Sequence, residues 1–166
     1  MKYALLLFAL TLGTVSYGQA NKALDTKNGF RALHFGDDIG RLPEAELVTD
    51  DGNSKIYSLP HDKLRIGDAK LEGIYYGFYK GKFYEVQVLA DSKTDGRLLK
   101  SALDDAYGPS KLIDSNDQFY SWRGEKVVMY YSEAGGLAWK MQMTSNLIKQ
   151  QMNKDKKPVK KVHNDL

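Results

Sequence analysis

The chain has 166 residues, of which 42% are hydrophobic and 27% are charged, and its formal net charge is +3. This length and balance favour one globular domain and exclude a disordered chain or a membrane-embedded bundle. The sequence contains no cysteine, which excludes disulfides, thiolate catalysis and cysteine-ligated metal.

The first twenty residues have the pattern of a cleavable secretory signal. Lys2 precedes the one long apolar run, residues 3–15, and small residues follow where a signal peptidase needs them. The run is too short for a membrane span, and a buried N-terminal helix is the alternative. We therefore expect a signal peptide at 1–20, cleaved after Gly18 or Ala20, and a periplasmic or secreted mature protein without a transmembrane segment.

Short elements are predicted for the N-terminal third of the mature chain. Residues 21–28 are polar, and we expect them to form a loose N-terminus. The glycine-bounded segment 29–36 predicts a short extended stretch, and 37–42 predicts a helical turn with an acidic cap that stops before a proline. A turn at 50–53 is followed by a predicted short strand at 55–59.

A β-hairpin formed by residues 71–79 and 83–90 gives the clearest strand signal. Period-two alternation places every second side chain on the same face of a strand. One predicted face comprises Ile74, Tyr76 and Phe78 of the first strand with Tyr84, Val86 and Val88 of the second.

Two loops are compatible with this hairpin. A two-residue turn at Lys80-Gly81 would place Tyr76 opposite Glu85 and bury a carboxylate. A three-residue loop at 79–81 pairs Tyr76 with Tyr84 and puts the glycine where a left-handed residue is needed. We therefore predict the longer loop.

The second half of the chain predicts one long helix and three strands. Leucines and alanines recur at helical spacing up to Tyr107; Ser92 or Thr94 can cap this helix, and Gly108-Pro109 ends it. Predicted strands follow at 119–122, 126–132 and 137–143, the last with one apolar and one polar face. Ser145 is expected to cap a short terminal helix.

These elements predict an α+β fold, an antiparallel β-sheet with one main helix packed on one face. Two half-repeats of the α-β-β type are suggested, because the turns at 79–81 and 122–124 both place glycine after a basic residue. We expect a single domain at 21–153 and a basic flexible tail at 154–166.

The basic charge is concentrated at the C-terminus. Residues 149–166 hold six lysines and two aspartates, a net charge of +4, so the body of the mature chain is acidic on balance. A nucleic-acid binder usually carries its positive charge on a folded surface with aromatic residues, so we expect no nucleic-acid partner. The tail is interpreted as a solvated end, with weak attachment to acidic lipids or polymers as the alternative.

The stretch from Leu98 to Thr144 resembles small bacterial envelope domains, the BamE-like lipoproteins and the β-lactamase-inhibitor-like domains. The matching features are Leu103, the helix end at 107–109, Trp122 and the alternating strand that ends at Met143. The chain is also similar to exported bacterial α+β proteins with segments like 30–36 and 76–81. This resemblance implies a fold and a compartment, and it transfers no functional residue; the lipid-carrying cysteine of the lipoproteins is absent.

No motif predicts catalysis or a cofactor. His34, His61 and His163 lack ligand spacing, and the paired aspartates lack the pattern of a calcium loop. A nucleophile elbow and a phosphate-binding loop are also missing. We therefore assign no catalytic, metal-binding or cofactor-binding residue.

The remaining candidate site is aromatic. The predicted register places Tyr75, Tyr79 and Phe83 together on the second face of the hairpin, next to two glycines. Such a patch can stack on a sugar or dock a partner chain. We expect a non-enzymatic envelope module that binds a protein, peptide or glycan through this face. The alternatives are an exported hydrolase or lyase that acts on a cell-wall or dietary polymer, and a purely structural periplasmic protein.

Overall fold

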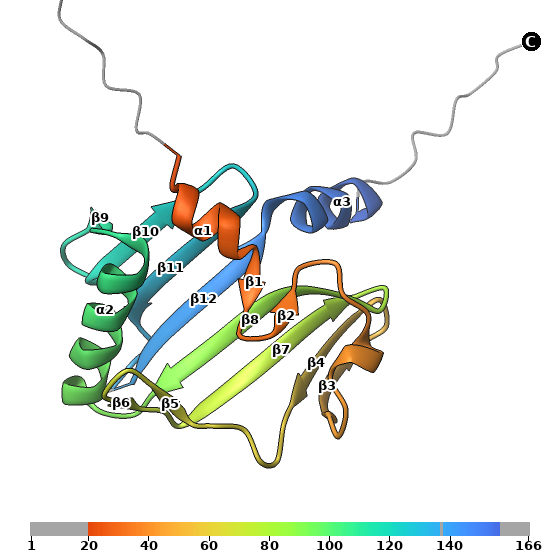
Figure 1. Ribbon diagram of the computed structural model, residues 1–166, viewed down its shortest axis with the longest axis horizontal. Coiled ribbons are helices and arrows are strands. Elements are labelled where there is room, and N and C mark those ends of the chain that lie inside the picture. The colour runs from red at the N-terminus through yellow and green to blue at the C-terminus, as the bar shows by residue number, and fades with distance from the viewer. Residues whose placement is uncertain (1–19, 137, 157–166) are drawn as a thin grey trace, which may run out of the picture.

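The computed structural model describes residues 20–136 and 138–156 and has the predicted α+β architecture (Figure 1). Its main sheet is antiparallel, with the strand order β3-β4-β7-β8-β12-β11-β10-β9. These strands are β3 (Glu46–Asp51), β4 (Ser54–Ser58), β7 (Gly73–Tyr79), β8 (Lys82–Ala90), β9 (Lys111–Asp114), β10 (Phe119–Arg123), β11 (Val127–Glu133) and β12 (Trp139–Ser145). The predicted signal peptide covers residues 1–20, of which 1–19 lie outside the described residues.

The sheet consists of two four-stranded meanders. Strands β3, β4, β7 and β8 form the first, strands β9 to β12 form the second, and β8 pairs with β12 at the junction. Helix α1 (Lys22–Lys27) precedes the first meander and α2 (Lys93–Tyr107) precedes the second. The half-repeat is therefore present in the topology, with four strands in each half. In this repeat the β7–β8 hairpin corresponds to the β11–β12 hairpin. The sequence analysis had instead matched the β7–β8 turn with the β10–β11 turn.

Helix α2 forms as its sequence predicts. The Ser92 hydroxyl caps it by accepting a hydrogen bond from the backbone N–H of Asp95 at 3.0 Å. Leu99 and Leu103 are buried against the sheet, which confirms the predicted apolar face. Gly108 follows the last helical residue with a φ of 78°, a conformation that favours glycine.

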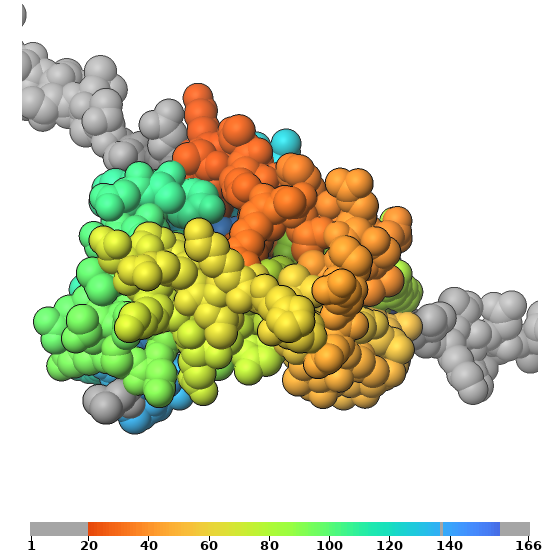
Figure 2. Space-filling model, turned by 60° about the horizontal axis from the view of Figure 1, so that its bottom comes forward, coloured from red at the N-terminus to blue at the C-terminus, as the bar shows by residue number. Residues whose placement is uncertain are grey.

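One face of the sheet is closed by α1, α2 and two short hairpins. The hairpins are β1 (Gly29–Phe30) with β2 (Leu33–His34), and β5 (Arg65–Ile66) with β6 (Ala69–Lys70); the 3-10 helix η1 (Ile39–Arg41) lies between β2 and β3. Figure 2 shows the yellow segment that contains β5 and β6 filling the surface between green α2 and the orange β3–β4 region. The main core lies beneath this layer and includes Phe78, Phe83, Val86, Leu103, Met129, Tyr131, Trp139 and Met141.

The prediction of a loose N-terminus at 21–28 is wrong. Asn21 caps α1, and its side-chain oxygen accepts a hydrogen bond from the N–H of Leu24 at 3.0 Å. Leu24 is fully buried in the main core, so one apolar residue anchors an otherwise polar segment. The Asp25 carboxylate accepts hydrogen bonds from the backbone N–H groups of residues 125–127, more than 90 positions away in the chain.

Helix α3 (Asn146–Lys156) lies on the other face of the sheet. It includes residues 154–156, so the ordered structure extends three residues into the segment predicted to be a tail; residues 157–166 lie outside the described residues. Helix formation continues there because Asp155 has partners on β7 and in the β7–β8 turn. None of the helices in the described ranges is long and apolar enough to span a membrane.

Candidate functional site

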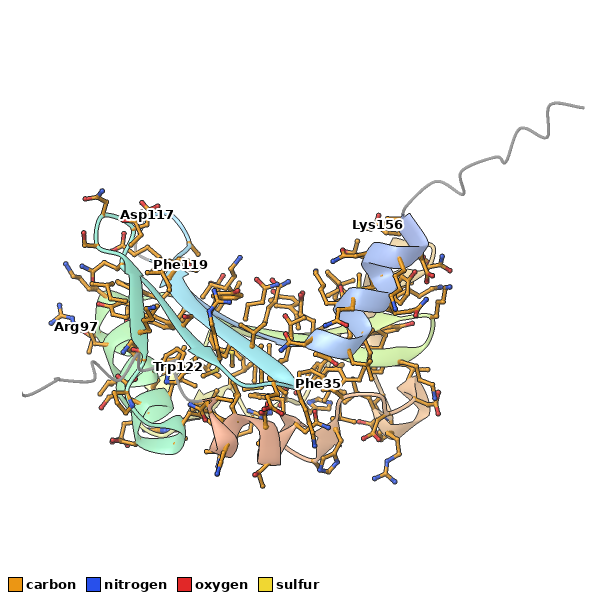
Figure 3. The ribbon with its side chains drawn as sticks, turned by 90° about the horizontal axis from the view of Figure 1, so that it is seen from above. Phe35, Arg97, Asp117, Phe119, Trp122 and Lys156 are labelled. Atoms are coloured by element: carbon orange, nitrogen blue, oxygen red, sulfur yellow. The ribbon has the colours of Figure 1, made fainter. Side chains whose placement is uncertain are left out.

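The sheet face opposite α1 and α2 is only partly covered. We call it the open face. Figure 3 shows α3, which ends at Lys156, and the β9–β10 turn around Asp117 rising at its two ends. The side chains of the open face alternate along their strands with residues of the main core. They include Tyr75 and Tyr79 of β7, Glu85 and Gln87 of β8, Lys140 and Gln142 of β12, Tyr130 and Ser132 of β11, and Phe119 of β10.

The predicted aromatic patch does not form as one surface, because Phe83 lies on the other face. Lys80 and Gly81 have φ values of 48° and 77° and make a two-residue turn, so that Tyr79 pairs with Lys82. A register shift after Gly77 then inserts one extra residue on β8. The two-residue turn pairs Phe83 with Phe78, so Phe83 is fully buried in the main core, and the prediction of the longer loop is wrong. The bulge then places Glu85 on the open face and returns Val86 to the core.

Tyr84 is the extra residue of this bulge, since it has no partner on β7. This residue was predicted on the core face, and it instead packs with Tyr79 and Met152 in a second, smaller cluster under α3. Burial, with a smaller contribution from the charge of Glu85, raises the pKa of Tyr84 to about 12. Val86 takes the place opposite Tyr76 that was predicted for Tyr84.

Tyr79 is on the expected face and is covered by α3. Its side chain is 6% exposed, and its hydroxyl donates a hydrogen bond to Asp155 at 2.7 Å. The Lys80 ammonium contacts the same carboxylate at 2.8 Å. Hydrogen bonds from Lys80 and then from Tyr79 lower the pKa of Asp155 to about 2. Tyr79 therefore holds α3 on the sheet and is not available to a partner.

Tyr75 is the one residue of the predicted patch that remains accessible. It is half-buried, and its ring lies over Gly73, where a Cβ atom would come within 2.9 Å of the ring carbon Cε2. Glycine at position 73 thus leaves space for the ring. Tyr75 pairs across the sheet with Gln87, so the ring lies next to an amide on the open face.

A buried carboxylate lies at the centre of the open face. Glu85 is 5% exposed, and its two oxygens accept hydrogen bonds from Gln87 at 2.7 Å and from Gln142 at 2.6 Å. The Thr144 hydroxyl is a more distant donor at 3.5 Å. Both carboxylate oxygens are therefore occupied by neighbouring side chains, and the network fixes the positions of two amides that face outward.

The side chains of Phe119, Tyr130 and Arg123 on β10 and β11 form a column, which was not predicted from the sequence. The rings of Phe119 and Tyr130 stack at 5.3 Å with an interplanar angle of 16°. The Arg123 guanidinium lies 5.4 Å from the centre of the Tyr130 ring. Phe119 and Arg123 flank Ser121, the cross-strand partner of Tyr130, so the tyrosine ring is held between them. Period-two alternation from the core residues Trp122 and Met129 could have placed this column on the open face.

Next to this column is a hollow of about 130 Å³, which we call the Lys140 hollow. It is lined by Phe119, Tyr130, Ser132, Lys140 and Gln142. Its volume corresponds to only a few water molecules at about 30 Å³ each. The open face therefore combines a shallow hollow, exposed ring edges and fixed amides, and it is suited to a surface contact more than to enclosure of a small molecule.

A larger hollow of about 540 Å³ lies at the ends of β8 and β12. Its lining includes Phe35, Lys82, Leu147 and Ile148. Two of its polar groups already have partners, because Lys82 pairs with Asp38 at 2.8 Å and the Asn146 amide donates to the Glu125 carbonyl at 2.9 Å. A ligand site needs converging free polar groups, so the open face is the stronger candidate.

The described residues include no group of three His, Cys, Asp or Glu side chains that could hold a metal ion. His34 and His61 are exposed, and His163 lies outside the described residues. Comparisons of the chain with family models, with curated proteins and with solved structures found no match. The candidate site therefore rests on the geometry of the open face.

Proposed function

We propose that this protein is a non-catalytic binding module, exported to the periplasm or secreted, that holds a protein partner on its open face. The observation that carries the proposal is the Arg123–Tyr130–Phe119 column. Arginine and aromatic side chains supply most of the energy in protein interfaces, because they bury large areas with few rotatable bonds. Here they are already ordered by mutual stacking, which lowers the entropic cost of binding.

The shape of the face supports a macromolecular partner. Helix α3 and the β9–β10 turn rise at the two ends of the open face (Figure 3). Half-buried Tyr75 on β7 lies on the other side of the β8–β12 junction from the column. A protruding loop would contact both. The fixed amides of Gln87 and Gln142 lie between Tyr75 and Tyr130 in the order of strands and can donate to its backbone.

The hydrolase alternative is less well supported. Glycoside hydrolysis requires one carboxyl group as an acid and a second as a nucleophile or base. Glu85 is the buried carboxylate of the open face, and its oxygens accept hydrogen bonds from Gln87 and Gln142. It is therefore buried and held by two amides, which leaves it poorly placed to reach a substrate.

Site-specific photo-crosslinking in the producing cell tests the proposal. A photoreactive amino acid replaces Ser132 on the open face or, as the control, the exposed residue Lys93 at the start of α2. We expect one adduct specific to position 132. Excess wild-type protein should compete for it, and the Tyr130→Ala variant should compete at least tenfold less well.

Two other results would each overturn the proposal. An adduct that stains as carbohydrate would make the ligand a glycan. Equal adducts from both positions, or equal competition by Tyr130→Ala, would mean that the open face is not the binding surface.

A further inference from the structure

We infer that the Lys140 hollow accepts a carboxylate from the partner, the side chain of an aspartate or glutamate. The inference rests on the proposed function, because it names the chemical group that the open face selects. Lys140 is the one charged residue among the described residues that line the hollow, and the other polar groups there belong to Ser132 and Gln142.

The charge of Lys140 has no compensating partner within residues 20–136 and 138–156. None of the ion pairs found in these ranges includes it. Its cross-strand neighbours are Ser132 on β11 and Leu89 on β8, and neither carries a charge. The side chain is half-buried between these strands. Partial desolvation of an unpaired ammonium is unfavourable, so an anionic occupant would stabilise the site.

The hydrogen-bond donors around the hollow match the acceptor positions of a carboxylate. An ammonium has three N–H donors, the serine hydroxyl has one, and an amide has two, of which Gln142 uses one on Glu85. A carboxylate offers about four lone-pair positions. Glu85 fixes the Gln142 amide, so this wall of the hollow is ordered before binding. Glu85 is thus a positioning residue and not a contact.

The charges near the hollow favour the same ligand. Arg123 lies at the far end of the stacked column, and Lys111 pairs with Ser121 on the neighbouring strand. The carboxylates near the hollow are Glu85, whose oxygens accept hydrogen bonds from Gln87 and Gln142, and the two aspartates Asp114 at the end of β9 and Asp117 in the β9–β10 turn. Asp114 accepts a hydrogen bond from the backbone N–H of Asn116 at 2.8 Å and so helps to form the turn. Lys140, Arg123 and Lys111 therefore attract an incoming anion to this half of the open face, the aspartates disfavour it at the tip of the turn, and the amides of Gln87 and Gln142 lie against the Glu85 carboxylate.

A cyclic-peptide display library selected on the immobilised protein tests this inference. Parallel selections use the wild type, Lys140→Gln, Tyr130→Ala and the control Lys93→Gln, which removes the same charge from the other side of the molecule. We expect wild-type peptides to share one aspartate or glutamate position. Their affinity should fall about ten- to a hundredfold for Lys140→Gln, as expected for loss of a hydrogen bond to a charged group at a half-buried site. It should stay within twofold for Lys93→Gln.

The outcomes separate the inference from the proposed function. Peptides that need Tyr130 but show no acidic position, or that bind Lys140→Gln equally well, would overturn the carboxylate inference and leave the open face as a binding surface. Enrichment that is independent of Tyr130, or no enrichment on the wild type, would overturn both. Melting curves of all variants verify that each protein is folded.

Discussion

Gln142 donates a hydrogen bond from Nε2 to Oε2 of Glu85 at 2.6 Å, across the junction at which β8 and β12 join the two meanders. Gln87 donates to the other oxygen of the same carboxylate. Glu85 therefore connects the halves of the sheet through side chains as well as through the backbone ladder. It also links stability to the proposed site, because Gln142 lines the Lys140 hollow.

Replacement of Glu85 by alanine should lower the free energy of unfolding by about 1–3 kcal/mol, because two amides lose a buried acceptor. Glu85→Gln should cost less, since an amide oxygen can still accept one of the two hydrogen bonds. Chemical denaturation measures both effects. Glu72→Ala is the control, because Glu72 is an exposed carboxylate next to β7. A Glu85→Ala protein as stable as this control would show that the network contributes nothing net.

Gly96→Ala should destabilise the protein, although alanine is the better helix former by about 1 kcal/mol. A Cβ atom at position 96 would lie 2.4 Å from the ring of Trp139, which stacks on Tyr131. Separation of α2 from the sheet to relieve this overlap should cost about 1–3 kcal/mol. Denaturation midpoints provide the measurement. Ser101→Ala, at an exposed position of the same helix, should be neutral or stabilising; an equal response of both variants would contradict the close contact.

Asp25→Ala should loosen the β10–β11 turn. Its carboxylate accepts from the backbone N–H groups of Glu125, Lys126 and Val127 at 2.7, 2.8 and 3.1 Å. Loss of these charge-assisted bonds should cost about 1–3 kcal/mol and increase hydrogen exchange at the three amides. Asp68→Ala is the matched control, since the Asp68 side chain is 89% exposed in a long contact with Arg65. Unchanged exchange at residues 125–127 would argue against the capping role.

The elements with a strong local pattern were predictable from the sequence, and those that depend on distant contacts were not. Helix α2 and strands β7, β8 and β12 follow from periodicity. Helix α1 was missed because its stability comes from Leu24 in the core and from the contact of Asp25 with a turn formed much later in the chain. Edge strands β3 and β9 are exposed along their whole length, so they carry no alternating pattern.

The candidate site shows the same division. Tyr75 could be placed from alternation along one strand. Phe83 could not, because a bulge at Tyr84 interrupts the alternation, and extrapolation back from Val86 and Val88 therefore places Phe83 on the wrong face. The Phe119–Tyr130 contact joins two strands whose pairing register follows only from the fold. Glu85 was treated as a residue that should avoid burial, whereas the neighbouring amides make its burial acceptable.

Acid should release α3 from the sheet before the main core unfolds. The pKa of Asp155 is lowered from 3.8 to about 2 in the folded protein, mainly by the hydrogen bonds from Lys80 and Tyr79. A lowered pKa means that the carboxylate stabilises the docked helix above about pH 4 and loses this effect as the pH falls towards 2. Hydrogen exchange of α3 amides, corrected for intrinsic rates, should increase over this window. Asp155→Asn should show faster exchange at neutral pH and no further change over the window; an equally steep response would assign the transition to another group.

Alanine substitutions along the hairpin should separate accessible rings from structural ones. Tyr76→Ala and Phe83→Ala should each cost about 3–5 kcal/mol, because both rings are buried in the main core. Tyr79→Ala should expose the α3 amides to exchange, since this ring anchors the helix.

Tyr75→Ala should cost less than about 1 kcal/mol, because its ring is only half-buried. In the competition assay with the crosslinker at position 132, Tyr75→Ala should weaken partner binding by about 1–3 kcal/mol, as a ring at an interface does. Denaturation and competition on the same preparations supply both numbers. Full binding by Tyr75→Ala would restrict the contact surface to the β10–β12 side of the open face, and a loss of stability equal to that of Tyr76→Ala would show that Tyr75 belongs to the core.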